Sequence, residues 1–254
     1  MIILKSRDEI ATMRRAGQVV AAAIDATRAA VRPGVTTAEL DRVAAGEIES
    51  RGALPSFLGY RGFPKTICTS VNEQIVHGIP GGRALKEGDL VKLDVGAIVD
   101  GFHADSAVTI PVGEASPEAL KLIETTERAL WAGLTEARVG NRLHDIGGAV
   151  QTIAEGAGFS VVREYVGHGV GRALHEEPAV PNYRPGGRGV QLTEGFVLAI
   201  EPMVNVGSFE TRLLDDGWTV VTADGSLSAH FEHTVAVTAD GPWVLTDAEG
   251  RFAA

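Results

Sequence analysis

Apolar residues recur at helical spacing in four segments of this 254-residue chain. Before the first segment, Ser6 and Glu9 form a capping box, a pair whose side chains accept each other's backbone N–H groups. The start signals predict four helices, over residues 8–31, 36–52, 116–137 and 141–158. Thr36 and Glu39 form a second capping box at the start of the second helix, and Ser116 followed by Pro117 marks the start of the third.

The two pairs of predicted helices repeat one spacing. Three residues of the first pair and three of the second lie 106 positions apart (140 − 34, 146 − 40 and 158 − 52), namely Gly34, Leu40 and Gly52 against Gly140, Ile146 and Gly158. Glycine is common in this chain, but matching helix pairs at one offset favour a degenerate duplication. We therefore expect one domain over residues 1–254, with related halves at roughly 1–112 and 113–254.

Apolar runs between and after the helices predict β-strands, and three Asp-Gly pairs suit tight hairpin turns. The expected strands are Thr66–Ser70, Leu90–Val99, Phe102–Ile110 and Val197–Ile200, with two further hairpins, Thr219–Ala223 with Ser226–Glu232 around Asp224-Gly225 and Thr234–Val237 with Trp243–Thr246 around Asp240-Gly241. Because hairpins make antiparallel sheets, the expected fold class is α+β rather than doubly wound α/β.

Composition limits the cellular compartment and the kinds of partner that we expect for the protein. No apolar run approaches the roughly 20 residues that span a bilayer, and the first residues lack the apolar stretch of a signal peptide. Cys68 is the single cysteine, so no internal disulfide forms and the cytoplasm is the expected compartment. A net charge of −10 disfavours sequence-independent binding of nucleic acid.

Two aspartates flank the first Asp-Gly turn, Asp100-Gly101. A two-residue loop there sets Asp94 opposite Ala107 and Asp105 opposite Gly96. Both carboxylates then lie on one face of the hairpin, with α-carbons roughly 7–8 Å apart. Gly96 is expected to leave open space opposite Asp105. Carboxylates this close repel each other unless a cation or a shared proton lies between them.

Two more carboxylates and one histidine are candidate site residues. The proline after Glu201 stops an apolar strand and leaves this carboxylate at its tip. The Asp224-Gly225 turn would set Glu232 opposite Gly217, a second carboxylate facing a glycine. His168 lies between two glycines that let large groups approach its ring.

Each of these residues also has an alternative interpretation in which it has no functional role. Asp94 and Asp105 can be solvated residues of an outer face, Glu201 an exposed acid, Glu232 a cross-strand charge and His168 a turn residue. Together, four carboxylates and one imidazole can hold two divalent ions, because carboxylates can bridge. The oxygen-rich set suits Mn, Fe(II), Co or Zn. Such ions lower the pKa of water and polarise a carbonyl group.

Five motifs resemble those of a known family: Asp94 and Asp105 in DVGAIVDGFHAD, His168 in GHGVGRALHEEP, Glu201 in AIEPM and Glu232 in FEHT. In order and spacing they resemble the metal ligands of the methionine aminopeptidases, over about residues 6–246. The short span from His168 to Glu201, with no zinc-finger extension before the first helix, resembles the type I (bacterial) form. The resemblance implies the pita-bread fold: one catalytic domain of pseudo-twofold halves, each a helix pair on a curved antiparallel sheet.

The resemblance also implies an activity, removal of the initiator methionine from nascent proteins with a small second residue. Asp94 would bind one divalent ion, His168 and Glu201 the other, and Asp105 and Glu232 both, with a bridging hydroxide as the nucleophile. Glu201 would move the proton. The implied partners are the N-terminal Met of nascent chains and the ribosome, with no membrane and no specific nucleic acid, and we expect a monomer.

Two histidines and an apolar pocket complete the implied site. His175 would stabilise the tetrahedral intermediate, and His77 would orient the substrate and help protonate the leaving amine. The implied methionine pocket is lined by Tyr60, Phe63, Cys68, His77, Leu174, His175 and Trp218, with Phe57 at its edge; ordinary core packing is the alternative for its aromatic residues.

Three positions near the pocket depart from the family pattern. Phe57 replaces a cysteine and Leu174 a phenylalanine of the best-known bacterial members, so the pocket volume is roughly kept. Arg61 replaces a common histidine, so the charge at the pocket mouth is expected to differ.

Two other functions compete with this prediction. A prolidase or Xaa-Pro aminopeptidase shares the five-ligand pattern, but those enzymes usually carry an additional N-terminal domain, for which the residues before Asp94 leave no room. A catalytically silent relative that binds protein or nucleic acid would have lost ligands, whereas all five positions are intact.

Overall fold

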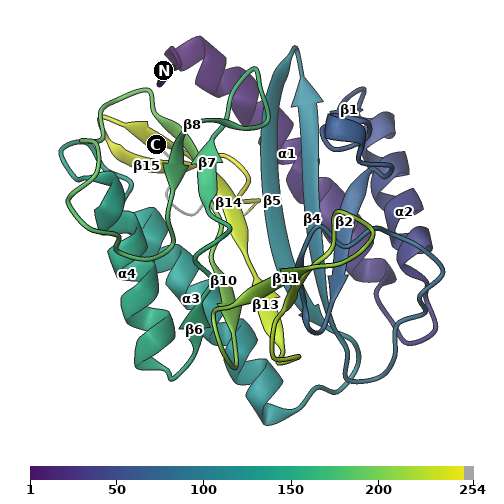
Figure 1. Ribbon diagram of the computed structural model, residues 1–254. Helices are drawn as coiled ribbons and strands as arrows, with labels where there is room; N and C mark the ends of the chain where they lie inside the picture. Colours follow the sequence, from purple (N-terminus) through teal and green to yellow (C-terminus); the bar gives the residue numbers. More distant parts are fainter. Residues whose placement is uncertain (249–254) are drawn as a thin grey trace.

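The computed structural model describes residues 1–248 and contains a nine-stranded antiparallel sheet at its centre (Figure 1). Its main path runs in the order β1 (Leu54–Pro55), β4 (Leu90–Val99), β5 (Phe102–Pro111), β14 (Glu232–Thr238), β9 (Val197–Ile200), β7 (Gly167–Gly169) and β8 (Glu176–Val180). Strand β2 (Ile67–Val71) pairs with β4, and β15 (Gly241–Val244) pairs with β14. The expected α+β class is confirmed.

Two three-stranded sheets lie beside the central one. The first has the order β13 (Ser228–His230), β10 (Met203–Asn205) and β6 (Ser160–Val161). The second has the order β11 (Thr211–Leu213), β12 (Val220–Thr222) and β3 (Gln74–Val76). Figure 1 shows β10, β11 and β13 in front of the central sheet.

Four helices pack in two pairs, as predicted. They are α1 (Arg7–Ala30), α2 (Thr37–Ser50), α3 (Pro117–Glu136) and α4 (Leu143–Gly156). Both predicted capping boxes are present, at Ser6 with Glu9 and at Thr36 with Glu39. Helix α1 crosses behind β4 and β5 in Figure 1 and buries its apolar stripe there, so the main core lies between sheet and helices.

The two helix pairs begin and end alike. Gly34 and Gly140 adopt positive φ angles of 88° and 93°, and their N–H groups donate to the carbonyls of Leu85 (2.8 Å) and Leu192 (3.0 Å). Gly52 and Gly158, which follow α2 and α4, also have positive φ angles. Glycine adopts this left-handed region without the strain of a Cβ atom, which explains the repeated spacing.

The Asp-Gly turns behave differently from one another. Asp100 and Gly101 both have positive φ (51° and 78°), so this hairpin has the predicted register, with Asp94 opposite Ala107 and Asp105 opposite Gly96. The pairing of β14 with β15 is confirmed, with Ala236 opposite Trp243, but the predicted turn is wrong by one residue: Thr238 lies opposite Gly241, so the loop is Ala239-Asp240 rather than Asp240-Gly241.

The predicted hairpin around Asp224-Gly225 is wrong. Gly225 has a positive φ of 77° but Asp224 does not, and the Asp224 carboxylate instead accepts bonds from the N–H groups of Ser208 (2.7 Å) and Ser226 (3.0 Å). The chain therefore splits here: β12 pairs with β11, while β13 pairs with β10. Consequently Glu232 lies opposite Ala107 of β5, and Gly217 lies in the turn between β11 and β12.

Two helical glycines form a matched pair for a stability test. A Cβ atom on Gly17 of α1 would lie 2.1 Å from the Leu245 carbonyl oxygen, whereas one on Gly46 of α2 would meet nothing within 4 Å. We expect Gly17→Ala to lower the free energy of unfolding by about 1–3 kcal/mol. Gly46→Ala should raise it by up to about 1 kcal/mol. Urea unfolding measures both, and equal effects would contradict the close approach of α1 to the segment after β15.

Candidate metal centre and active site

The five predicted ligands lie on five neighbouring strands. Asp94 is on β4, Asp105 on β5, Glu232 on β14, Glu201 directly after β9 and His168 on β7, and these strands follow one another in the sheet. Pro202 ends β9 as predicted, so Glu201 lies at the strand tip. Neighbouring strands are about 4.8 Å apart, so side chains on one face can reach a shared centre.

The strand register places all five side chains on one face, in two rows. In the first row, Ala107 lies between Asp94 and Glu232. In the second row, Ala199 lies between His168 and Thr234, and the Thr234 hydroxyl donates to Asp105 Oδ1 at 3.0 Å. Small residues therefore separate the candidate ligands and leave space above the sheet.

The ligand atoms converge. One ligand atom each from Asp105, His168 and Glu232 lie within 4.8 Å of one another, and no other such group of three is found among residues 1–248. His168 Nε2 lies 3.5 Å from Asp105 Oδ2 and 3.5 Å from Glu201 Oε1.

His168 carries its lone pair toward these carboxylates. Its Nδ1 lies 2.9 Å from the carbonyl oxygen of Gly169, which can only accept, so Nδ1 carries the proton. Burial lowers the pKa of His168 to about 4, so the ring is neutral at pH 7. An acceptor nitrogen facing two carboxylate oxygens is unfavourable without a cation between them, so the donor arrangement fits a divalent metal.

The four carboxylates, like His168, are in an environment that a nearby cation would stabilise. Burial, followed by the charge of Asp105, raises the pKa of Asp94, Glu201 and Glu232 well above the usual range. Burial raises the pKa of Asp105 to about 6. Asp94 Oδ1 is buried and has no hydrogen-bond partner among the described residues. Two divalent ions would stabilise these four desolvated carboxylates and would give the unpartnered oxygen of Asp94 a metal-binding role.

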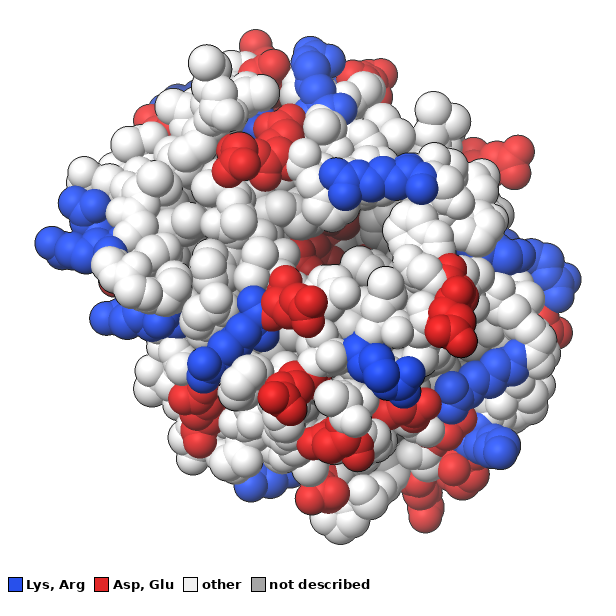
Figure 2. All heavy atoms as spheres, viewed as in Figure 1, with Lys and Arg blue, Asp and Glu red and all other residues white. Residues whose placement is uncertain are grey.

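A cavity of about 140 Å³ opens above the five residues. Figure 2 shows acidic side chains inside a central hollow on this face. The structure brings every predicted pocket residue to this cavity, which is lined by Phe57, Tyr60, Arg61, Phe63, Cys68, His77, Asp94, Asp105, His168, Leu174, His175, Glu201, Trp218 and Glu232. Phe57, Phe63, Cys68 and Leu174 form a buried apolar cluster beside the carboxylates.

The two candidate catalytic histidines are held by aromatic neighbours. His175 stacks on Tyr60 with ring centroids 5.3 Å apart, and its Nδ1 lies 2.9 Å from the Tyr60 hydroxyl. His77 lies edge-on to Trp218, with centroids 6.4 Å apart. Burial lowers the pKa of both histidines to about 4. Neutral imidazoles can donate a hydrogen bond to a carbonyl oxygen or an amine without adding charge.

The expectation about Gly96 is wrong in one respect. A Cβ atom there would lie 2.7 Å from Phe57 Cε1 and 2.7 Å from Ser56 Cβ. The space opposite Asp105 is therefore filled rather than open, because the Phe57 ring enters it from the pocket edge. Glycine at this position lets Phe57 approach the sheet closely.

Sequence reasoning missed two residues of the site. Thr234, in the FEHT motif, donates to Asp105 Oδ1 and to the Asp105 carbonyl (2.8 Å). His230 is buried, its Nε2 lies 3.8 Å from Glu201 Oε2, and neither ring nitrogen has a hydrogen-bond partner among the described residues. Their nearness to Glu232 in the chain was the available signal.

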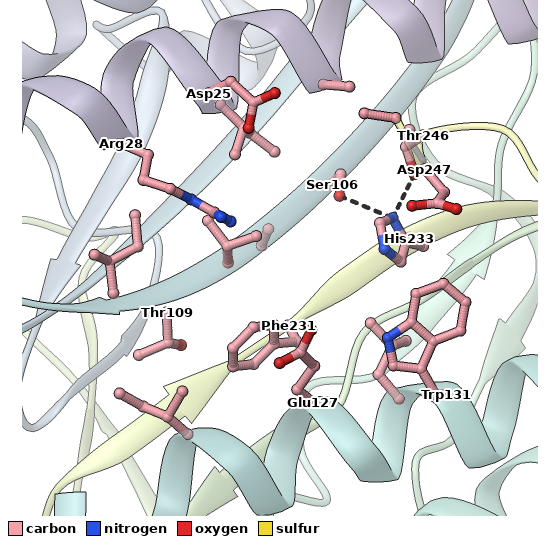
Figure 3. Close-up of a pocket in the computed structure, with 18 of the residues that line it drawn as sticks. Asp25, Arg28, Ser106, Thr109, Glu127, Trp131, Phe231, His233, Thr246 and Asp247 are labelled. Atoms are coloured by element: carbon pink, nitrogen blue, oxygen red, sulfur yellow. Dashed lines mark hydrogen bonds between the residues drawn. The ribbon is translucent and has the colours of Figure 1, made fainter. Parts of the chain in front are cut away.

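A larger cavity, of about 490 Å³, lies on the opposite face of the sheet between α1 and α3 (Figure 3). His233 points into this region, toward Ser106 (3.3 Å) and Thr246 (2.8 Å). Because side chains alternate along β14, Glu232 and His233 face opposite sides. Among residues 1–248, no three ligand atoms converge in this cavity, so the smaller cavity is the candidate site.

No helix within residues 1–248 combines the length and the apolar composition that crossing a membrane requires.

Comparisons with known proteins agree with this geometry. Residues 11–239 match metallopeptidase family M24. Methionine aminopeptidase from Clostridium perfringens is 54% identical over 246 residues, which cover 97% of this chain and 99% of that protein. The crystal structure of methionine aminopeptidase from Rickettsia prowazekii superposes with a TM-score of 0.95 at 43% identity, covering 97% of this chain and 100% of that one.

More distant structures share the fold. A prolidase from Pyrococcus furiosus superposes with a TM-score of 0.77 at 21% identity; the match covers 97% of this chain but 66% of the prolidase. Such a likeness shows the pita-bread fold alone. Identity across nearly the full length and the matched family domain lead to one conclusion: this chain belongs to metallopeptidase family M24, among its methionine aminopeptidases.

Proposed function

We propose that this enzyme removes the initiator methionine from polypeptides whose second residue is small. The observation that carries the proposal is the placement of four carboxylates and one imidazole on five adjacent strands, next to a buried apolar cluster of Phe57, Phe63, Cys68 and Leu174. The apolar cluster offers a place for a methionine side chain. The carboxylates lie beside it, where the scissile bond would be.

Each ligand has an assigned place in the proposal. Asp94 would hold one divalent ion (Co, Mn, Fe(II) or Zn), His168 and Glu201 the second, and Asp105 and Glu232 both. When bound, two such ions would lower the pKa of a water molecule and polarise the scissile carbonyl. Glu201 is suited to proton transfer because burial and its acidic neighbours raise its pKa.

The chain's other polar groups orient the substrate. His175, fixed by Tyr60, would donate to the oxygen that becomes negative as the carbonyl is attacked. His77 would orient the substrate and help protonate the leaving amine. Tyr60, Phe63, Cys68, Leu174 and Trp218 would surround the methionine side chain.

The broader setting follows from the substrate. We infer that the enzyme acts in the cytoplasm on nascent chains near the ribosome, as a monomer. The equivalent helix starts at Gly34 and Gly140 support one catalytic domain over residues 1–254, with related halves at roughly 1–112 and 113–254.

A peptide assay tests the function directly. The protein, loaded anaerobically with each candidate ion in turn, should cleave Met-Ala-Ser and leave Ala-Pro-Ala intact. Cleavage of Ala-Pro-Ala would indicate an Xaa-Pro aminopeptidase. Two bound ions by elemental analysis, without hydrolysis of any Met-starting peptide, would indicate a binding protein.

Replacing His175 separates its role from metal binding. We expect His175→Ala to lower kcat by about 10²–10³, the loss typical of one donor to a developing oxyanion. Metal content should stay near two ions, because His175 is not one of the five proposed ligands and its Nδ1 contacts the Tyr60 hydroxyl. His144→Ala, on the distant helix α4, serves as the control. Loss of metal from His175→Ala would mean that this histidine is a ligand.

A further inference from the structure

Among residues 1–248, Arg61 is the single Lys or Arg that lines the candidate active-site cavity. Its guanidinium carbon lies 5.4 Å above the Tyr60 ring, and its side chain is exposed. No carboxylate among residues 1–248 forms an ion pair with it. The cation therefore lies at the cavity mouth without a neutralising partner in the described part of the chain.

The backbone of the loop that carries Arg61 is held in a defined turn. Arg61 has a φ angle of 49°, in the left-handed region, and lies between Gly59 (φ 82°) and Gly62 (φ 91°). Backbone bonds close the turn: Tyr60 N–H donates to Phe57 O at 2.9 Å, and Gly59 N–H donates to Phe63 O at 2.8 Å. A non-glycine residue in this conformation is strained, and such strain gathers at functional sites.

No other fixed positive charge lines the described part of the cavity. The other lining residues of the described chain are apolar or aromatic side chains, the three histidines and the four carboxylates. Asp216, in the turn before Trp218, is engaged by the Trp218 and Thr219 N–H groups and by the Thr219 hydroxyl.

The direction of the substrate chain brings its later residues past Arg61. In the proposed function the methionine side chain would enter the apolar cluster and the scissile bond would lie over the carboxylates, so the rest of the polypeptide would leave through the mouth. On the basis of the proposed function, we propose that Arg61 is a specificity-determining residue that favours substrates with an acidic side chain at the third or fourth position and disfavours basic ones there.

Peptide amides test this inference, because they carry no C-terminal carboxylate. Met-Ala-Asp-Leu-amide should be cleaved with a kcat/KM about threefold above that of the isosteric Met-Ala-Asn-Leu-amide, and Met-Ala-Lys-Leu-amide about threefold below it, as expected for an exposed ion pair. Met-Ala-Gly-Asp-amide against Met-Ala-Gly-Asn-amide locates the contact. Raising the salt concentration from about 0.05 M to 0.5 M should shrink these ratios.

Variants that suit the left-handed backbone keep the test independent of folding. Asn and Asp tolerate positive φ, so Arg61→Asn should bring the Asp-to-Lys ratio to about one and Arg61→Asp should invert it, while Arg61→Lys should retain it. Arg51→Asn, which removes an exposed arginine paired with Glu47 on α2, should leave the ratio unchanged.

The outcomes separate this inference from the proposed function. If the wild-type enzyme cleaves no Met-starting peptide, the proposed function fails. If it cleaves the Asp, Asn and Lys peptides at equal kcat/KM, the function stands and the role of Arg61 is overturned. An acidic preference that persists in Arg61→Asn, or that does not respond to salt in the wild type, overturns it as well.

Discussion

Replacing Asp105 with alanine or asparagine is expected to lower kcat/KM at least about 10³-fold, because metal assistance supplies several kcal/mol of transition-state stabilisation. Asp105 is the central carboxylate. Its Oδ2 lies 3.5 Å from His168 Nε2, and its charge is the largest electrostatic contribution to the raised pKa of Asp94, Glu201 and Glu232. Elemental analysis of the variant should show fewer than two bound ions.

Although Asp105→Asn should lower activity, it should raise the stability of the metal-free protein. The asparagine side chain of the Asp105→Asn variant would keep the Thr234 hydrogen bond but remove a buried like charge from the group. At neutral pH, the chelator-treated Asp105→Asn protein should therefore unfold at a higher urea concentration than the chelator-treated wild type. A residue with an ordinary structural role would not stabilise the protein when replaced.

Asp89 provides the matched control. It is buried as well, but its carboxylate accepts from Asn72 Nδ2 (2.9 Å) and from Lys86 N–H (2.9 Å), and it does not line the active-site cavity. Asp89→Asn should lower stability and leave the activity per folded molecule and the metal content intact. Near-normal turnover by metal-replete Asp105→Ala would rule out a bridging role for Asp105.

Local sequence signals predicted the parts of the site that depend on neighbouring residues. Asp100 and Gly101 both adopt positive φ, so the turn alone determined how Asp94 and Asp105 share a face. The capping boxes located the helix starts for the same reason, because donor and acceptor lie three residues apart.

Other parts depend on strands that are distant in the sequence. Asp224-Gly225 resembles the first turn, yet its flanking strands pair with β10 and β11 instead of with each other. The neighbours β5 and β14 join Ala107 to Glu232, a contact that no hairpin rule provides. The five-strand order therefore had to come from the structure, although the ligand chemistry and the resemblance to a family had grouped the five residues in advance.

The pocket shows a third kind of limit. Phe57, Leu174 and Arg61 were identified as departures from the family pattern, but their consequences depend on packing. The Phe57 ring occupies the space beside Gly96, and Arg61 takes a left-handed backbone conformation between two glycines.

Removing the metal should make stability fall as pH rises above about 6.5. Buried Asp94, Glu201 and Glu232 have raised pKa values in the folded protein, so there they keep protons that the unfolded chain has already released. Where the folded state holds more protons, the free energy of unfolding decreases with pH, by about 1.4 kcal/mol per pH unit for each such proton.

The pH range in which this decrease can be measured depends on the other titratable groups. Burial lowers the pKa of His77, His168 and His175 to about 4, so between about pH 4 and 6.5 these histidines make stability rise with pH and offset the acids. Above about pH 6.5 they are neutral in both states and contribute nothing. Asp105, whose pKa is about 6, has also lost its proton there. Burial lowers the pKa of Lys92 to about 7, so above about pH 7 this lysine makes stability rise with pH, with or without metal. The difference between the slopes of metal-free and metal-loaded protein from about pH 6.5 to 8 thus reports the three remaining carboxylates.

Urea unfolding of chelator-treated protein at several pH values measures this slope, and the metal-loaded protein is the control. Bound divalent ions hold the carboxylates deprotonated, so stability of the loaded protein should not fall with pH in the same window, and loading should release protons. Asp94→Asn should reduce the slope of the metal-free protein, whereas Asp89→Asn should not. Equal slopes with and without metal would mean that the four acids do not share one desolvated centre.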